Sequence, residues 1–206
     1  GGDGFESAVD PTNGDIMYGA LYYGQIFKST NGGSSFNTIV NSGGTGVNEN
    51  GGWLTPYMLD PSDPNTLYIG KSTVYKSTDG GANFTALGGI AGGNINALAV
   101  SKSNANYIFA SKGGNLYRST NGNNFAALTG LPNLSITYIC IDPADENNVW
   151  VTLSGFSNGN KVYYSADAGD SWTNYSDGLP NIPANTIVYH EGSNDALYVG
   201  TDAGVY

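Results

Sequence analysis

One short turn recurs four times along the chain, and its spacing limits the folds that the chain can adopt. It is YKSTDGGANF from Tyr75 to Phe84, and it returns as FKSTNGGSSF, YRSTNGNNF and YYSADAGDSW. The serines of the four copies lie 48, 42 and 46 residues apart, at Ser29, Ser77, Ser119 and Ser165. A period of about 45 residues is typical of one four-stranded blade of a β-propeller.

Short apolar or alternating runs fill each period. The first run ends in Asp-Pro in SAVDP (7–11), YMLDP (57–61) and ICIDP (139–143). Gly, Pro and Asn interrupt each stretch before a helix could propagate. We therefore predict an all-β propeller of four-stranded antiparallel blades in a single domain, 1–206. The expected repeats are about 7–50, 51–92, 93–132 and 133–180, followed by an incomplete one at 181–206.

The fifth repeat reaches Tyr206 two residues before the position expected for its turn serine. One explanation is that the chain is a piece of a larger propeller. The other is a five-bladed propeller whose last blade is completed by N-terminal residues. The N-terminal GGDGFES is short for a closing strand, which favours the larger propeller.

The charge of the chain argues against two classes of partner. Seven Lys and Arg stand against 17 Asp and Glu, for a net charge of −10. Nucleic acid and anionic membranes both need clustered basic residues, so neither is expected as a partner. Cys140 is the single cysteine and lies in an apolar run, which predicts a buried, unreactive thiol.

The repeated turn follows the pattern Ser-x-Asp/Asn-x-Gly-x-x-aromatic, and its chemistry is local. Ser and Asp or Asn side chains bond to turn amides, Gly supplies positive φ, and the aromatic ring buries area. The third copy is one residue short, and we expect Asn123 to take the glycine's positive φ. The structural residues are Ser29, Asn31, Gly33, Phe36, Ser77, Asp79, Gly81, Phe84, Ser119, Asn121, Phe125, Ser165, Asp167, Gly169 and Trp172.

These turns resemble the Asp-box, or BNR, repeat of β-propeller proteins. That family includes sialidases, xyloglucanase-type glycoside hydrolases, sortilin-type receptors and secreted bacterial repeat proteins. The stretch DPSDPNTLYIGKSTVYKSTDGGANF is especially similar to repeats of secreted Bacteroidetes proteins. The resemblance implies that the turn joins the third and fourth strands and is structural. It also implies an extracellular or cell-surface location.

Two loops depart from the repeat, at 41–56 and at 154–161. In a propeller both belong to the face around the channel mouth, together with 21–25 and the N-terminus. This places Asp3, Phe5, Tyr22, Tyr23, Glu49, Trp53, Tyr57 and Phe156 on one face. Rings beside carboxylates and amides suit a sugar, so Tyr22, Tyr23, Trp53, Tyr57 and Phe156 are candidate ligand contacts. The alternative is that the rings are buried in the core or wedged between blades.

Asp3 and Glu49 are the candidate carboxylate pair for a glycoside hydrolase, which needs two such groups. GGDGF is similar to the glycine-flanked aspartate of xyloglucanase-type propellers, but Gly-Asp-Gly also forms ordinary turns. A sialidase is excluded because it needs an arginine cluster and the chain has only Arg118. His190 is the single histidine, and we expect a turn or packing role for it.

No cofactor is expected, since one His and one Cys provide no zinc ligand set. Calcium stays open at 142–148, DPADENN, although these residues also suit turns. The expected function is a binding or scaffold module for a glycan or an extracellular protein. The alternatives are an endo-acting polysaccharide hydrolase of xyloglucanase type and a purely structural or adhesive repeat.

Overall fold

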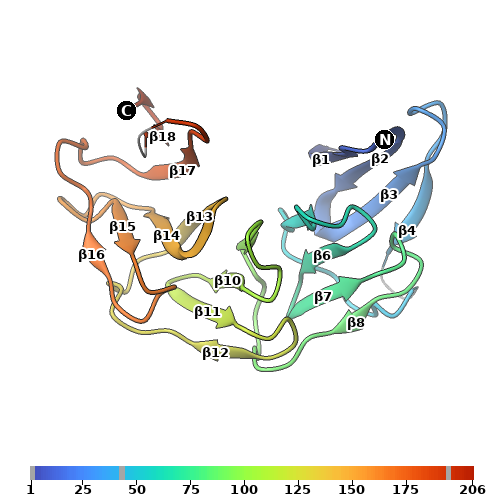
Figure 1. Ribbon diagram of the computed structural model, residues 1–206, viewed down its shortest axis with the longest axis horizontal. Helices are drawn as coiled ribbons and strands as arrows, with labels where there is room; N and C mark the ends of the chain where they lie inside the picture. Colours follow the sequence, from blue (N-terminus) through green and yellow to red (C-terminus); the bar gives the residue numbers. More distant parts are fainter. Residues whose placement is uncertain (1–2, 42–44, 194–195) are drawn as a thin grey trace. The chain divides into compact units, whose positions relative to one another are not determined.

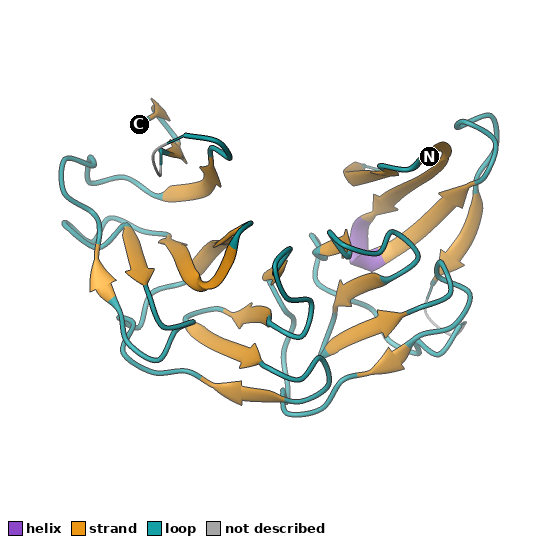
Figure 2. Ribbon diagram, in the orientation of Figure 1, coloured by secondary structure: helices purple, strands orange, loops and turns teal. Residues whose placement is uncertain are grey.

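The computed structural model describes residues 3–41, 45–193 and 196–206, and its strands form five antiparallel sheets. In each sheet the strands pair in chain order, so every sheet is a meander (Figure 1). The single described helix is one 3-10 turn, η1 (Tyr22–Gly24) (Figure 2). None of the described helical residues forms a segment with the length and apolar character needed to cross a membrane.

The five sheets are the blades of a β-propeller, which confirms the predicted fold class. The first holds β1 (Gly4–Asp10), β2 (Asn13–Leu21), β3 (Gln25–Ser29) and β4 (Asn37–Val40). The second holds β5 (Tyr57–Leu59), β6 (Leu67–Gly70), β7 (Val74–Ser77) and β8 (Thr85–Ala86). The third holds β9 (Ala97–Val100), β10 (Ile108–Lys112), β11 (Asn115–Ser119) and β12 (Phe125–Ala127). The fourth holds β13 (Ile136–Asp142), β14 (Asp145–Leu153), β15 (Val162–Ser165) and β16 (Thr173–Asn174). The fifth has three described strands, β17 (Ala184–Tyr189), β18 (Leu197–Thr201) and β19 (Gly204–Val205).

The chain divides into two compact units, each of which has its own core. Unit 1, residues 1–96, contains blades 1 and 2, and unit 2, residues 97–206, contains blades 3 to 5. First strands of successive blades touch within each unit: β1 meets β5, and β13 meets both β9 and β17. The core of unit 1 includes Tyr18, Ile26, Leu67, Ile69 and Phe84, and the cores of unit 2 include Phe109, Val149, Val151, Trp150 and Ile187.

A strand covered on both faces is largely apolar, and the second half of β14 shows this most clearly. Its last five residues, VWVTL at 149–153, are all buried, because blades 3 and 5 pack on its two sides. The first strand of blade 1 differs from expectation at its start. It begins at Gly4, before the predicted Ser7, because β2 is long enough for Leu21 to pair with Gly4.

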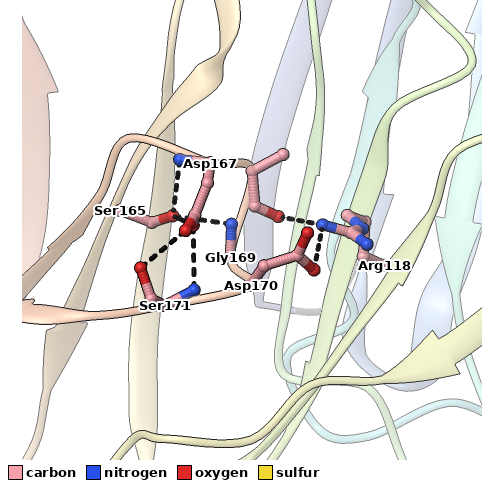
Figure 3. A network of polar contacts seen from close by, with 7 residues as sticks. Arg118, Ser165, Asp167, Gly169, Asp170 and Ser171 are labelled. Carbon is pink, nitrogen blue, oxygen red and sulfur yellow. Dashed lines mark hydrogen bonds and ion pairs between the residues drawn. The ribbon is translucent and has the colours of Figure 1, made fainter.

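In the fourth copy of the repeated turn, side-chain oxygens accept hydrogen bonds from backbone amides of the turn (Figure 3). The Ser165 hydroxyl donates to Asp167 at 2.7 Å and accepts from the Gly169 amide at 2.7 Å. Asp167 in turn accepts from the Ser171 amide at 2.8 Å. Ser165 and Gly169 are buried, so the bond between them satisfies polar groups that water cannot reach. The turn is thereby held by its own residues.

The first and second copies repeat this arrangement. Ser77 bonds to Asp79 and accepts from the Gly81 amide, and Asp79 accepts from the Asn83 amide. In the first copy Asn31 takes the aspartate's place, with the same bonds from Ser29 and from the Ser35 amide. An amide oxygen therefore accepts the same two hydrogen bonds in this turn that a carboxylate oxygen accepts in the second and fourth copies.

The third copy departs from the sequence-based expectation. Positive φ falls on Gly122, at 71°, and Asn123 does not adopt it. The Asn121 side chain accepts from the amides of Asn123 and Asn124 at 3.0 and 2.9 Å. The residue lost from this copy is thus the second glycine itself, rather than a glycine exchanged for Asn123. The hydrogen bond that the amide of this glycine donates to the serine hydroxyl in the other copies is therefore lost as well.

A cation on the third strand ties a blade to the turn of the next blade. In unit 1 the Lys28 ammonium donates to the Gly80 carbonyl at 2.8 Å. In unit 2 the Arg118 guanidinium donates to the Ala168 carbonyl at 2.8 Å and pairs with Asp170 at 2.9 Å (Figure 3). Gly80 and Ala168 hold the same place in their turns, one residue after the aspartate.

The turn carboxylates predict a measurable acid sensitivity. Hydrogen bonds from Asn83 lower the pKa of Asp79 to about 2, and those from Ser171 and Ser165 do the same for Asp167. A depressed pKa stabilises the fold above the unfolded pKa, near 3.8, and this stabilisation disappears as the pH falls to 2. Asp79→Asn should therefore be less stable than wild type at pH 6, and the difference should shrink between pH 4 and pH 2 in urea unfolding.

The first turn provides the matched control, because its natural residue is already an amide. Asn31→Asp should gain stability above pH 4 relative to wild type and lose that gain as the pH falls toward 2. A difference between Asp79→Asn and wild type that stays constant across this range would contradict the role given to the carboxylate.

Candidate functional site

The long connection from blade 1 to blade 2 is held against η1 by backbone bonds. Of this connection, 42–44 lie outside the described residues, as do 1–2 of the N-terminal segment. The Tyr23 amide donates to the Trp53 carbonyl at 3.2 Å, and the Gly51 amide donates to the Tyr23 carbonyl at 2.9 Å. Tyr23 adopts φ 60°, which is unfavourable for a residue other than glycine. These two bonds help to hold it there.

Four rings meet at this point, and we call them the Trp53 cluster: Phe5, Tyr22, Tyr23 and Trp53. Tyr22 stacks on Trp53 at 5.3 Å between ring centroids and an interplanar angle of 10°. Tyr23 and Phe5 approach Trp53 edge-on, at 5.4 and 6.0 Å. Trp53 nevertheless stays 53% exposed and Tyr23 42% exposed. The cluster is therefore a positioned aromatic surface that is open to solvent.

Glu49 and Lys71 support the loop that carries Trp53. Lys71 is 1% exposed, and its ammonium donates to the Glu49 carbonyl at 2.7 Å. The Glu49 carboxylate accepts from the Ser72 amide at 3.1 Å and from the Ser72 hydroxyl at 2.6 Å. The backbone carbonyl and the carboxylate of Glu49 are thus both bonded to residues that directly follow β6.

The protonation state of Glu49 does not suit a general acid. Burial acts to raise its pKa, but bonds from Ser72 and Tyr75 and the charge of Lys71 outweigh burial and lower the pKa. A general acid for glycoside cleavage needs a raised pKa. Asp3, the other member of the proposed pair, is exposed at the start of the described chain.

A carboxyl with a raised pKa does occur in unit 1, at Glu6. Glu6 is an exposed residue, but its carboxyl lies beside Tyr57. Desolvation by burial raises the pKa of this carboxyl, and a hydrogen bond from the Tyr57 amide, at 3.3 Å, lowers it by a smaller amount. The Tyr57 hydroxyl donates to the Glu6 carbonyl at 3.1 Å. Sequence reasoning missed Glu6; its one signal is its position next to Phe5.

The other two candidate rings, Tyr57 and Phe156, have different surroundings. Tyr57 is 5% exposed and belongs to the core of unit 1, as the alternative of buried rings expects. Phe156 is 73% exposed in unit 2, on the connection between β14 and β15. The structure therefore brings together Phe5, Tyr22, Tyr23 and Trp53, and Glu49 belongs to the loop that carries Trp53.

Polar residues elsewhere mainly bond within turns. Asp142 and Asp145 accept from the amides of Ala144 and Asn147, at 2.8 and 3.0 Å. The His190 carbonyl accepts from the Ser193 hydroxyl at 2.6 Å. Burial raises the pKa of the Cys140 thiol. Within the described ranges, no group of three His, Cys, Asp or Glu side chains is placed to hold a metal ion.

Comparisons with known proteins identify the fold. No family model and no curated protein matches this sequence. Among solved structures, the GH74 enzyme of Niastella koreensis matches 97% of this chain with a TM-score of 0.73 and 23% identity. The GH74 xyloglucanase of Xanthomonas campestris matches 95% with a TM-score of 0.74 and 16% identity. YCF48 of Cyanidioschyzon merolae matches 99% with a TM-score of 0.66 and 18% identity.

These matches cover unequal shares of the compared proteins. The chain spans about a third of the two GH74 structures, at 35% and 33%, and 68% of YCF48. At such low identity the likeness establishes the β-propeller fold.

Proposed function

We propose that the chain is a non-catalytic carbohydrate-binding module that uses the Trp53 cluster as its contact surface. The observation that carries the proposal is the exposed Trp53 ring, fixed by three ring contacts and by a loop bonded to η1. Sugars present flat C–H faces that pack on such rings, and a ring that is already fixed loses little entropy on binding. The likeness to GH74 xyloglucanases favours a polysaccharide as the ligand.

The setting of this module is part of the proposal. We take the repeated turns as Asp boxes and the protein as an extracellular or cell-surface component of a secreted bacterial system. The serine, Asp or Asn, and glycine bonds of the turns and the acidic composition support this assignment. A glycan or an extracellular protein is then the natural partner, with neither a cofactor nor nucleic acid involved.

Trp53→Ala tests the proposal with soluble xyloglucan as the probe, in isothermal titration and affinity electrophoresis. We expect wild type to bind and the variant to bind about tenfold more weakly or not at all, a change of about 1.4 kcal/mol. Tyr198→Ala is the control, because Tyr198 is a half-exposed ring of unit 2 outside the Trp53 cluster. Equal binding by wild type and Trp53→Ala, with both folded by circular dichroism, would refute this contact surface.

The hydrolase alternative makes a different prediction in the same experiment. Its support is the GH74 likeness, and its candidate residues are Asp3 and Glu49. Release of reducing ends from xyloglucan by wild type, abolished in Asp3→Asn, would establish it in place of the binding module. Under the binding proposal, xyloglucan stays uncleaved and Asp3→Asn binds as wild type does.

A further inference from the structure

In each of the first three blades, one cross-strand pair joins an aromatic residue of the second strand to a Lys or Arg of the third strand. We call the position of this pair in the ladder the rung. Tyr18 pairs with Lys28 in blade 1, Tyr68 with Lys76 in blade 2, and Phe109 with Arg118 in blade 3. In blades 1 and 2 the lysine ammonium lies 5.4 Å from the centroid of the tyrosine ring. This distance is within the range of a cation–π contact.

Blade 4 keeps the ring on this rung but has no cation there. Trp150 pairs with Tyr164, and the two rings stack at 5.0 Å and 27°. Tyr175 lies 6.0 Å from Tyr164 and is 56% exposed. Three rings thus occupy the region where the other blades place one ring and a positive charge.

A pocket of about 150 Å³ opens beside these rings. It is lined by Asp142, Asn148, Trp150, Tyr164, Tyr175 and Leu197, all within unit 2. Asn148 is held in place, since its side-chain oxygen accepts from the Tyr164 hydroxyl at 2.6 Å. Trp150 is 5% exposed and Asp142 is 8% exposed, so the pocket has a buried aromatic wall and a buried carboxylate.

The Asp142 carboxylate lacks the compensation that its counterparts have. In blade 1 Asp10 accepts from the Thr12 amide and hydroxyl, both at 2.7 Å, and the charge of Lys28 adds a smaller effect. In blade 2 Asp60 accepts from the Ser62 amide and hydroxyl, at 2.9 and 2.7 Å, and from the Tyr68 hydroxyl at 3.2 Å. Asp142 accepts from the Ala144 amide through one oxygen, and among the described residues its second oxygen has only a long contact, 3.4 Å, to the Asn148 side-chain amide. The ion pairs of the described residues, Lys102–Glu191 and Arg118–Asp170, leave Asp142 out. A buried carboxylate favours a nearby positive charge.

We propose that this pocket binds a free small organic ammonium cation, held by the Trp150, Tyr164 and Tyr175 rings and by the Asp142 carboxylate. The ligand's charge takes the role that Lys28 and Lys76 play in blades 1 and 2. Aromatic faces beside a carboxylate are the usual recognition chemistry for alkylammonium groups. The residues that line this pocket all belong to unit 2, whereas the Trp53 cluster belongs to unit 1.

Choline is the probe, and 3,3-dimethylbutan-1-ol, its uncharged isostere, is the matched ligand control. In titrations followed by tryptophan fluorescence and ligand-observed NMR, we expect choline to bind and the isostere to bind at least about tenfold more weakly. Asp142→Asn, which keeps the shape and removes the charge, should weaken choline binding at least about fivefold. Asp60→Asn, at the matching position of blade 2, should leave choline binding unchanged.

Tyr164→Lys is the second variant, because it gives blade 4 the lysine that blades 1 and 2 already have. We expect it to fold and to lose choline binding, since the protein's own ammonium then occupies the site. The proposal is overturned if choline and its isostere bind equally, if neither binds, or if Tyr164→Lys is folded and binds choline as wild type does. Phosphatidylcholine vesicles should not co-sediment the protein; vesicle binding without binding of free choline would overturn the assignment to a free ligand.

Discussion

Replacing Gly46 by alanine should lower the free energy of unfolding by about 2–5 kcal/mol. Gly46 adopts φ 89°, where a side chain costs about 1–2 kcal/mol. Its added Cβ would also overlap the Phe84 carbonyl oxygen, and relieving such overpacking costs about 1–3 kcal/mol more. Because the overlap is with backbone, no rotamer change can remove it. Urea unfolding measures the loss.

Gly93→Ala is the matched control in the same unit. Gly93 also has positive φ, 73°, but no atom lies within 4 Å of a Cβ added there. It should show only the backbone cost of about 1–2 kcal/mol. Equal losses in the two variants would mean that the approach of Gly46 to Phe84 is unimportant.

Lys71→Met should lower the free energy of unfolding by about 1.5–3 kcal/mol, and it should also weaken xyloglucan binding. The variant keeps most of the buried side-chain volume but leaves the Glu49 carbonyl without its charged donor. A hydrogen bond from a charged group contributes about 1.5–3 kcal/mol. Glu49 and Trp53 belong to one loop. Loss of the bond to Glu49 should therefore make this loop less ordered, and the Trp53 ring should no longer be held in a fixed position. Chemical denaturation and isothermal titration give the two results.

Lys161→Met separates the two effects. Lys161 is equally buried, and its ammonium donates to the Gly155 carbonyl at 2.7 Å in unit 2. It should lose similar stability yet bind xyloglucan as wild type does. If both variants lose binding alike, the cause is general destabilisation, and the specific support of the Trp53 loop by Lys71 is disproved.

The repeated turn could be predicted from the sequence because its contacts are local. Ser77, Asp79 and Gly81 bond to one another within five residues, so residue type and spacing nearly determine the geometry. The error in the third copy has an equally local cause. A deletion beside Asn123 can be aligned in two ways, and only the backbone conformation shows which residue is missing.

The candidate site could be predicted only in part. The order of strands in a blade places 21–25 and 41–56 on one face, but it does not say which rings touch. Trp53 and Tyr57 are four residues apart, and the first is exposed while the second is in the core. Lys71 was missed because a lysine after a strand normally points to solvent. Its burial depends on the Glu49 carbonyl, 22 residues earlier in the chain.

The Lys or Arg that bonds one blade to the turn of the next blade also affects the order in which parts of the protein unfold. Lys28 holds the turn at Gly80, and Arg118 holds the turn at Ala168, so the turns of blades 2 and 4 depend on the blade that precedes them. Such coupling is of the nearest-neighbour kind, and it has a direction. Opening of blade 3 would release the turn of blade 4, whereas opening of that turn would leave the strands of blade 3 paired. Amide hydrogen exchange in the presence of mild denaturant should therefore spread from blade 1 to the turn of blade 2 and from blade 3 to the turn of blade 4.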